Sequence, residues 1–350
     1  MSFAFRALTL PEDGEVVREL FQLGFPEVRG SAAESLEHIG WKFGGSADAG
    51  LSLLGFEGDR PVAFYGVLPR EYRIRGEPHV IGLVVDVMSH PEVRRRGLFV
   101  ATGSAAMERL EGSDVEAVIG FPIRDDVMPG HLKVGWRADF ELPVYVLPTG
   151  WKGTPGLEAP RWLWAFNAAA KAYRMASGPL RRRPQGTSAW LTAEEFAAHP
   201  VVQDLCSPVP RWSQLSKTPE FWRWRLSRPG ADYHCVVAES GGSSAYAVVR
   251  ELELRGVPSL AVLDLAGSAP GALRLVLSSL LDLARRRGCS TIAMCANPSL
   301  ARHLRLGRSG FLRSPLRFTL IHRPTSAGPV DDWFAQEREW RLAWVDSDTV

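Results

Sequence analysis

The sequence has little cysteine, almost no surplus charge of either sign, and no long apolar run. Its four cysteines, Cys206, Cys235, Cys289 and Cys295, form no Cys-x-x-Cys pair and have no His at zinc-like spacing. We therefore expect neither a disulfide framework nor a metal site. Basic residues number 41 and acidic residues 39, for a formal net charge of +2, and this balance predicts no nucleic-acid partner. Apolar stretches stay below the roughly 18 residues that a membrane-spanning helix needs.

The composition is that of an ordinary globular protein with more than one domain. Apolar residues make up 45% of the chain and charged residues 23%, which is typical of proteins with a packed core. A chain of 350 residues is longer than one core usually serves, so we expect two domains. The first residues lack the basic start and apolar run of a secretory signal. Together with the scarce cysteine, this predicts a cytoplasmic protein.

The pattern of residues 1–150 predicts an α+β domain. An apolar alternation at 3–8 and helices near 11–23 and 31–41 come first. From residue 51 apolar residues recur at every second position between Gly, Pro and Asp signals, which predicts an antiparallel meander. A helix, a buried strand, a short helix and a closing strand then follow at 97–111, 115–121, 129–134 and 144–147. The expected fold is a mixed, mostly antiparallel sheet flanked by helices.

The second half repeats this order of elements within residues 187–324. Strand-like runs at 233–239, 244–254 and 259–265 precede a helix at 270–287, a strand at 291–295, a short helix at 299–306 and a strand at 316–322. The repetition predicts a duplicated domain. Phe221–Arg225 predicts a packed helix whose arginines face solvent, and residues 325–350 predict an aromatic tail that docks as a helix.

Residues 151–186 differ from both halves and predict a helical connector that ends in a basic run. Aromatic residues such as Trp162 and Trp164 share this segment with Lys171 and Arg174, and three consecutive arginines precede Pro184. An amphipathic helix of this composition also suits a membrane surface. Surface contact with a membrane is therefore a second interpretation of this segment.

The segment most informative about chemistry is Val84–Val100, in which a strand runs through an Arg-rich turn into a helix. The first amides of a helix have no partner within it, and with the helix dipole they favour an anion. Gly97 lets a ligand approach the backbone, and Arg94, Arg95 and Arg96 add positive charge. These features predict a pyrophosphate site. A solvated helix start is the alternative interpretation.

The same segment resembles the signature of the GNAT acetyltransferases. That signature reads Arg or Gln, two residues, Gly, one residue, then Gly or Ala, and Arg94–Phe99 stands in its place here. Phe99 departs from the pattern, which bears on the fit of the pyrophosphate. Gly120–Pro122 and Gly135-Trp136 are similar to the end of the GNAT core, although Ile123 stands where many members have Asn. The resemblance is best over residues 50–148.

The resemblance implies that acetyl-CoA binds as a co-substrate and that a strand end, a turn and a helix start hold it. Asp86 is the sole acid in the apolar run Val80–Met88, and it is the candidate base for the amine. His131, where many relatives carry Tyr, is the candidate acid near the sulfur. Structural roles remain the alternative for both residues. The implied coenzyme contacts are Val87, Met88, Ser89, Arg94, Arg95, Arg96, Gly97, Leu98, Phe99 and Val100.

We therefore expect a tandem GNAT protein with one working coenzyme site. The second half resembles the fold, but Leu265–Gly271 carries no basic residue at the place of the phosphate turn, which predicts a degenerate repeat. The expected reaction moves an acetyl or short acyl group to a primary amine of a small molecule or amino sugar. A monomer or homodimer is expected. A non-catalytic acyl-CoA-binding sensor or scaffold is the alternative function.

Overall fold

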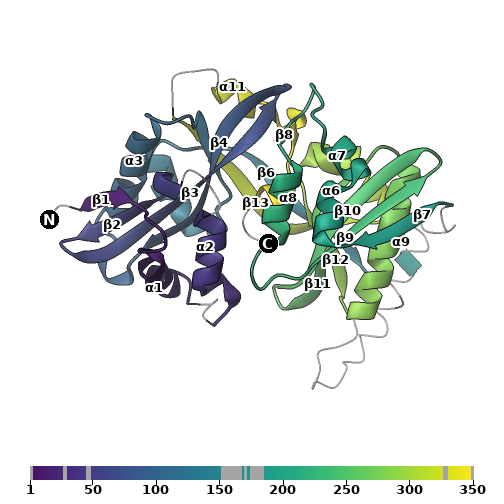
Figure 1. Cartoon of the computed structure of the whole chain (residues 1–350), viewed down its shortest axis with the longest axis horizontal. Helices are drawn as coiled ribbons and strands as arrows, with labels where there is room; N and C mark the ends of the chain where they lie inside the picture. The colour runs from purple at the N-terminus through teal and green to yellow at the C-terminus, as the bar shows by residue number, and fades with distance from the viewer. Residues whose placement is uncertain are drawn as a thin grey trace.

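The computed structural model describes residues 3–26, 30–44, 49–150, 185–325 and 330–347, together with Ala168, Ala172 and Tyr173. The predicted connector and its membrane-surface interpretation fall almost entirely outside these residues. Among the described residues, 14 strands form one continuous sheet flanked by helices (Figure 1). Within the same ranges, the helices all fall short of the length and apolar character required to cross a bilayer.

The first half follows the predicted order of elements. Within the predicted meander, residues 60–74 form a single long strand, because its hairpin partner pairs with it continuously past Pro69. The elements are β1 Ala4–Ala7, α1 Gly14–Gly24, α2 Leu36–Gly44, β2 Leu53–Glu57, β3 Arg60–Ile74, β4 Glu77–Ser89, α3 Leu98–Leu110, β5 Ala117–Gly120, α4 Met128–Lys133 and β6 Arg137–Pro148.

The second half also confirms the predicted order, with additional short helices before its meander. Its elements are β7 Thr187–Leu191, α6 Ala193–Ala198, α7 Pro200–Cys206, β8 Ser213–Leu215, α8 Pro219–Leu226, β9 Tyr233–Ser240, β10 Ser243–Leu254, β11 Val257–Gly267, α9 Pro270–Arg287, β12 Thr291–Cys295, α10 Pro298–His303, β13 Leu312–Pro324, α11 Val330–Phe334 and β14 Trp340–Arg341.

The strand order reads almost the same from either edge of the sheet. It runs β1-β2-β3-β4-β5-β13-β6-β12-β11-β10-β9-β7. On each side an antiparallel meander leads to one parallel pair, β4 with β5 and β11 with β12. The two halves therefore have the same local topology on opposite sides of β6 and β13, which lie at the centre of the molecule (Figure 1).

The two central strands are exchanged between the halves. β13, from the second half, pairs antiparallel with β5 of the first, and β6 pairs antiparallel with β12 of the second. β6 and β13 also pair with each other. The sequence analysis expected each strand to close its own half. That expectation was wrong, because apolar alternation shows that a segment is a strand but does not specify its neighbour.

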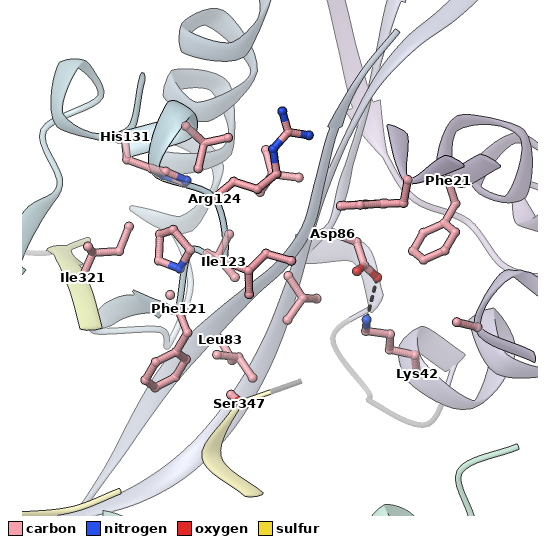
Figure 2. Close-up of a pocket in the computed structure, with 18 of the residues that line it drawn as sticks. Phe21, Lys42, Leu83, Asp86, Phe121, Ile123, Arg124, His131, Ile321 and Ser347 are labelled. Carbon is pink, nitrogen blue, oxygen red and sulfur yellow. Dashed lines mark hydrogen bonds and ion pairs between the residues drawn. The ribbon is translucent and has the colours of Figure 1, made fainter. Parts of the chain in front are cut away.

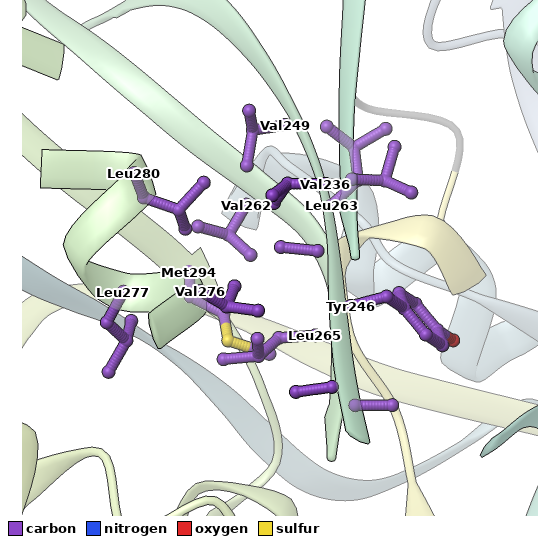
Figure 3. Packing of buried hydrophobic residues seen from close by; sticks show 14 of the residues in the cluster. Val236, Tyr246, Val249, Val262, Leu263, Leu265, Val276, Leu277, Leu280 and Met294 are labelled. Atoms are coloured by element: carbon purple, nitrogen blue, oxygen red, sulfur yellow. The ribbon is translucent and has the colours of Figure 1, made fainter. Parts of the chain in front are cut away.

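Large apolar clusters fill both halves. In the second half, α9 packs its apolar face against β9–β12, where Val262, Leu280 and Met294 are fully buried (Figure 3). In the first half, one cluster lies under α1 and α2 and another under α3. These packed layers hold β4 and its neighbours as a rigid frame.

The aromatic tail docks as predicted but is not one helix. Trp333, Trp340 and Trp344 are buried against the first half. Among the described residues of the tail, Val330–Phe334 is the α-helical part, and Trp340 then pairs with Ser213 in a short parallel bridge.

A stacked tryptophan pair joins the two halves through α2 and α8. The rings of Trp41 and Trp224 lie 4.8 Å apart at an interplanar angle of 4°. Each indole Nε1 donates to the other residue's carbonyl oxygen, at 2.7 and 3.1 Å. The prediction that α8 packs is confirmed. Its arginines do not both face solvent, because Arg225 is buried and donates to the Tyr233 hydroxyl.

Candidate active site

The centre of the site is a bulge in β4. Phe64 pairs with Met88 and Gly66 with Val85, so Asp86 and Val87 together stand opposite the single residue Tyr65. Asp86 has a positive φ of 49°, a conformation that non-glycine residues adopt mainly where surrounding structure enforces it. Such a bulge redirects the chain and its side chains.

The strands β4 and β5 diverge close to this bulge. Their parallel pairing ends at Leu83 with Ile119, and β5 itself ends at Gly120. β4 continues to Ser89. Beyond Leu83 this edge of β4 therefore has no strand beside it among the described residues, and Val87, Met88 and Ser89 line a hollow there. The sequence analysis expected these three residues to face a ligand.

An ion pair fixes the carboxylate of Asp86. Lys42 Nζ of α2 lies 2.6 Å from Asp86 Oδ2, and the side chains are only 3% and 16% exposed. Lys42 was not among the residues predicted for the site. Position 42 lies just beyond the helix predicted near 31–41, and its contact with a strand more than 40 residues later is a tertiary feature that no local pattern indicates.

The Arg-rich turn after β4 ends at Gly97, which precedes α3. Gly97 has φ +80°, a left-handed conformation that suits glycine, and a Cβ at this position would meet no atom within 4 Å. The first helical bond joins Ala101 N to the Gly97 carbonyl oxygen. The amides of Leu98, Phe99 and Val100 thus precede the helical ladder, and they border the open hollow.

Two of the three arginines face this hollow, which has a volume of about 430 Å³. Arg94 and Arg95 line it, whereas Arg96 does not. Arg96 instead forms an ion pair with Glu57 and lies over the ring of Phe3. We therefore correct the expectation that all three guanidinium groups serve one anion. Consecutive residues in a turn point in different directions, and Glu57 on β2 supplies a competing carboxylate.

Two cations that the sequence analysis missed also line the hollow. Lys133 comes from α4, and Arg124 comes from the loop after β5. The guanidinium group of Arg124 donates to both carboxylate oxygens of Asp126, at 3.0 and 2.6 Å. Both cations lie some 30 residues after the Arg-rich turn in sequence, and the end of β5 brings them beside it.

The structure explains how Phe99 is accommodated. A Cβ added to Gly130 of α4 would lie 2.6 Å from the ring of Phe99, so the ring occupies space that only glycine leaves free. The same ring meets His131 edge to face, with centroids 5.0 Å apart. Phe99 therefore forms the wall between α3 and α4.

A second cavity, of about 290 Å³, continues from the hollow. Phe25, Val87, Phe99, Arg124 and Val127 line both spaces. Most other residues around the second cavity are apolar. Figure 2 shows the Asp86–Lys42 pair on one side of β4 and His131, with Phe121, on the other.

His131 is a neutral group in this wall. It is buried, and its Nδ1 atom has no hydrogen-bond partner among the described residues. Burial lowers the pKa of its imidazole from 6.5 to about 4. At neutral pH the ring is therefore uncharged, and it cannot act as an imidazolium acid, which disfavours the acid role predicted from the sequence.

The second half completes the second cavity. Arg228 follows α8, Ile321 belongs to β13, and Ser347 lies in the tail, and all three line the space. The turn between β11 and α9, which corresponds to the Arg-rich turn in the second half, is closed. Ser268 N donates to the Ser244 carbonyl oxygen at 2.9 Å, and Ser244 N donates to the Ser268 hydroxyl at 3.0 Å.

The family described as acetyltransferase (GNAT) domain matches residues 6–137. No curated protein matches the sequence.

Solved structures resemble nearly the whole chain. A GCN5-related N-acetyltransferase from Anabaena variabilis superposes with a TM-score of 0.64 at 11% identity, covering 93% of this chain and 73% of that one. Eis1 from Mycobacterium abscessus gives 0.58 at 15% identity, with 93% and 74% covered. N-myristoyltransferase from Saccharomyces cerevisiae, with bound myristoyl-CoA, gives 0.59 at 13% identity, with 93% and 79% covered. At such low sequence identity, these structural similarities show only that the chain shares the fold of these proteins.

Proposed function

We propose that this chain, whose residues 6–137 match the acetyltransferase (GNAT) domain family, transfers an acetyl or short acyl group from coenzyme A to a primary amine of a small molecule or amino sugar. The observation that carries the proposal is the continuity of the two spaces at the parted strands. One space has helix amides and cations suited to a pyrophosphate, and the other is an apolar cavity with a carboxylate.

The donor occupies the hollow in this proposal. The diphosphate lies against the first amides of α3, with Arg94 and Arg95 beside it. The pantetheine follows the free edge of β4 past Val87 and Ser89, and the thioester reaches the wall that both spaces share. There the backbone of the bulge offers donors to the carbonyl oxygen, where negative charge develops during attack.

The acceptor amine approaches from the second cavity. Its nitrogen forms a bond to the thioester carbonyl carbon, the carbon–sulfur bond breaks, and the coenzyme leaves as a thiolate. Asp86 accepts the proton that the amine loses, directly or through water, and Lys42 holds the carboxylate in place. His131 is uncharged at neutral pH, so we assign it hydrogen bonding in the wall, and the thiolate takes its proton from solvent.

The test is isothermal titration of acetyl-CoA into the wild type and two arginine variants. The Arg94→Gln/Arg95→Gln variant should lose about 10²- to 10⁴-fold in affinity, since it removes two charged hydrogen bonds that each contribute about 1.5–3 kcal/mol. Arg96→Gln is the matched control, because Arg96 faces Glu57 instead, and it should bind like the wild type. Absence of binding to the wild type would refute the donor site.

A turnover assay distinguishes an enzyme from a non-catalytic sensor. With an amine panel, the wild type should release free thiol from acetyl-CoA, and Asp86→Asn should not. Coenzyme binding without thiol release from any amine would favour the alternative, a non-catalytic acyl-CoA-binding module.

The second half, in this proposal, is a duplicated and degenerate copy of the first. The matching strand order and the reciprocal Trp41–Trp224 contact support a common origin. Its closed turn at Ser268, without a basic residue, supports the loss of a donor site. Its present role is then to complete the acceptor cavity.

A further inference from the structure

Arg228 brings a charged nitrogen into the acceptor cavity, and no carboxylate of the described residues pairs with it. It lines the second cavity, and its Nη1 atom is buried with no hydrogen-bond partner among those same residues. The ring of Trp41 lies 6.0 Å from its guanidinium carbon. A buried guanidinium group is stable only when it is paired or hydrogen-bonded.

The protein holds this side chain in place from two sides. Upstream, α8 is fixed to α2 by the Trp41–Trp224 stack. Downstream, Gly230 has φ +70°, and a Cβ there would lie 2.2 Å from the Cβ of Ala32. The loop between these points cannot move away without breaking a close contact at either end. Arg228 is therefore positioned rather than merely exposed on a surface loop.

The other charges of the cavity are already used within the described residues. Asp86 binds Lys42 at 2.6 Å, and Arg124 binds Asp126 at 2.6 Å. The remaining lining is mostly apolar. The cavity thus has a positive charge in excess next to surfaces that suit a hydrocarbon body.

We propose that the acceptor carries a carboxylate as well as its amine, and that Arg228 binds this carboxylate. The inference rests on the proposed acyl transfer and names the substrate class for the same site: an apolar amino acid or a related amino carboxylate. A carboxylate matches the planar guanidinium group in shape. Its single negative charge balances the one guanidinium charge in excess, whereas a doubly charged phosphate would leave one charge in apolar surroundings.

The test compares two probes that differ only in the anionic group. 4-Phenylbutyrate and 4-phenylbutan-1-ol are titrated into protein saturated with coenzyme A. The wild type should bind the carboxylate at least 10-fold more tightly than the alcohol. Arg228→Gln should remove this preference, and Arg228→Lys should keep part of it.

Arg223→Gln is the control variant, because Arg223 lies on α8 but pairs with Glu194 at the surface. It should leave the preference unchanged. Equal affinity for the two probes in the wild type, or a preference that survives Arg228→Gln, would overturn the proposal. Failure to bind either probe would overturn it too. Because acetyl-CoA affinity is measured on the same samples, failure of the donor site would be seen separately.

Discussion

Replacement of Gly97 by alanine tests whether the start of α3 binds the diphosphate. The backbone at Gly97 has φ +80°, and an L-residue in this conformation costs about 1–2 kcal/mol. The added methyl would meet no protein atom within 4 Å, so strain is the only cost to the folded protein. The same methyl would occupy open space beside the hollow that Gly97 lines, where the proposal places the diphosphate.

The chain provides a matched control. Gly256, in the hairpin between β10 and β11, also has φ +80°, and a Cβ added there would likewise meet no atom within 4 Å. Gly256→Ala should therefore lose about the same 1–2 kcal/mol of stability. It lies in the second half, away from the hollow.

Gly97→Ala and Gly256→Ala should differ in their affinity for acetyl-CoA. Loss of one charge-assisted hydrogen bond is worth about 1.5–3 kcal/mol, so Gly97→Ala should bind about 10- to 100-fold more weakly. Gly256→Ala should bind like the wild type. Urea unfolding and isothermal titration measure the two quantities. Equal acetyl-CoA affinity in the two variants would refute the placement of the diphosphate.

Three further predictions concern the walls of the site. Gly130→Ala should displace the ring of Phe99 and weaken acetyl-CoA binding, and Phe99→Ala in the same chain should restore it, as titration will show. Burial lowers the pKa of His131 to about 4, so the unfolded chain binds more protons between about pH 4 and 6.5. Folding stability should thus fall by about 3 kcal/mol as the pH drops through that window, and His131→Gln should flatten this part of the urea-unfolding profile. Asp86→Asn should lower kcat about 10²- to 10⁴-fold with acetyl-CoA affinity unchanged, and both Asp86→Asn and Lys42→Met should cost about 3–5 kcal/mol of stability, because each removes one partner of a mostly buried ion pair.

Local features of the fold were predictable from sequence. Helix α9 begins at Pro270 and ends at Arg287, where the sequence analysis placed it, because Pro suits a first helical turn and Gly288 a C-cap. The turn at Gly97 was recognisable for the same reason, since it depends on neighbouring residues. The partner of β5 was not predictable, because β13 lies almost 200 residues later and any apolar strand would fit the pattern.

Some residues of the candidate site could be predicted from the sequence, and others could not. The resemblance to the GNAT signature implied Val87, Met88 and Ser89 as site residues, and the structure places them on the hollow. Lys42 and Arg228 reach the acceptor cavity only through the packing of α2 and α8, which no local pattern reports. Arg96 is the opposite case: the motif indicated it as a site residue, but its ion pair with Glu57 determines where its side chain lies.

The exchange of β6 and β13 has a consequence for synthesis of the protein. At about 5–20 residues per second, the ribosome adds β13 roughly 10–40 s after β5, the strand beside which it must lie. During that interval the nascent first half presents an unpaired edge, which is a template for aggregation. The coenzyme turn is complete by then, but the acceptor cavity still lacks Ile321 and Ser347. If the proposed function holds, a nascent chain therefore acquires its donor site before its acceptor cavity, and chaperone demand should concentrate in that interval.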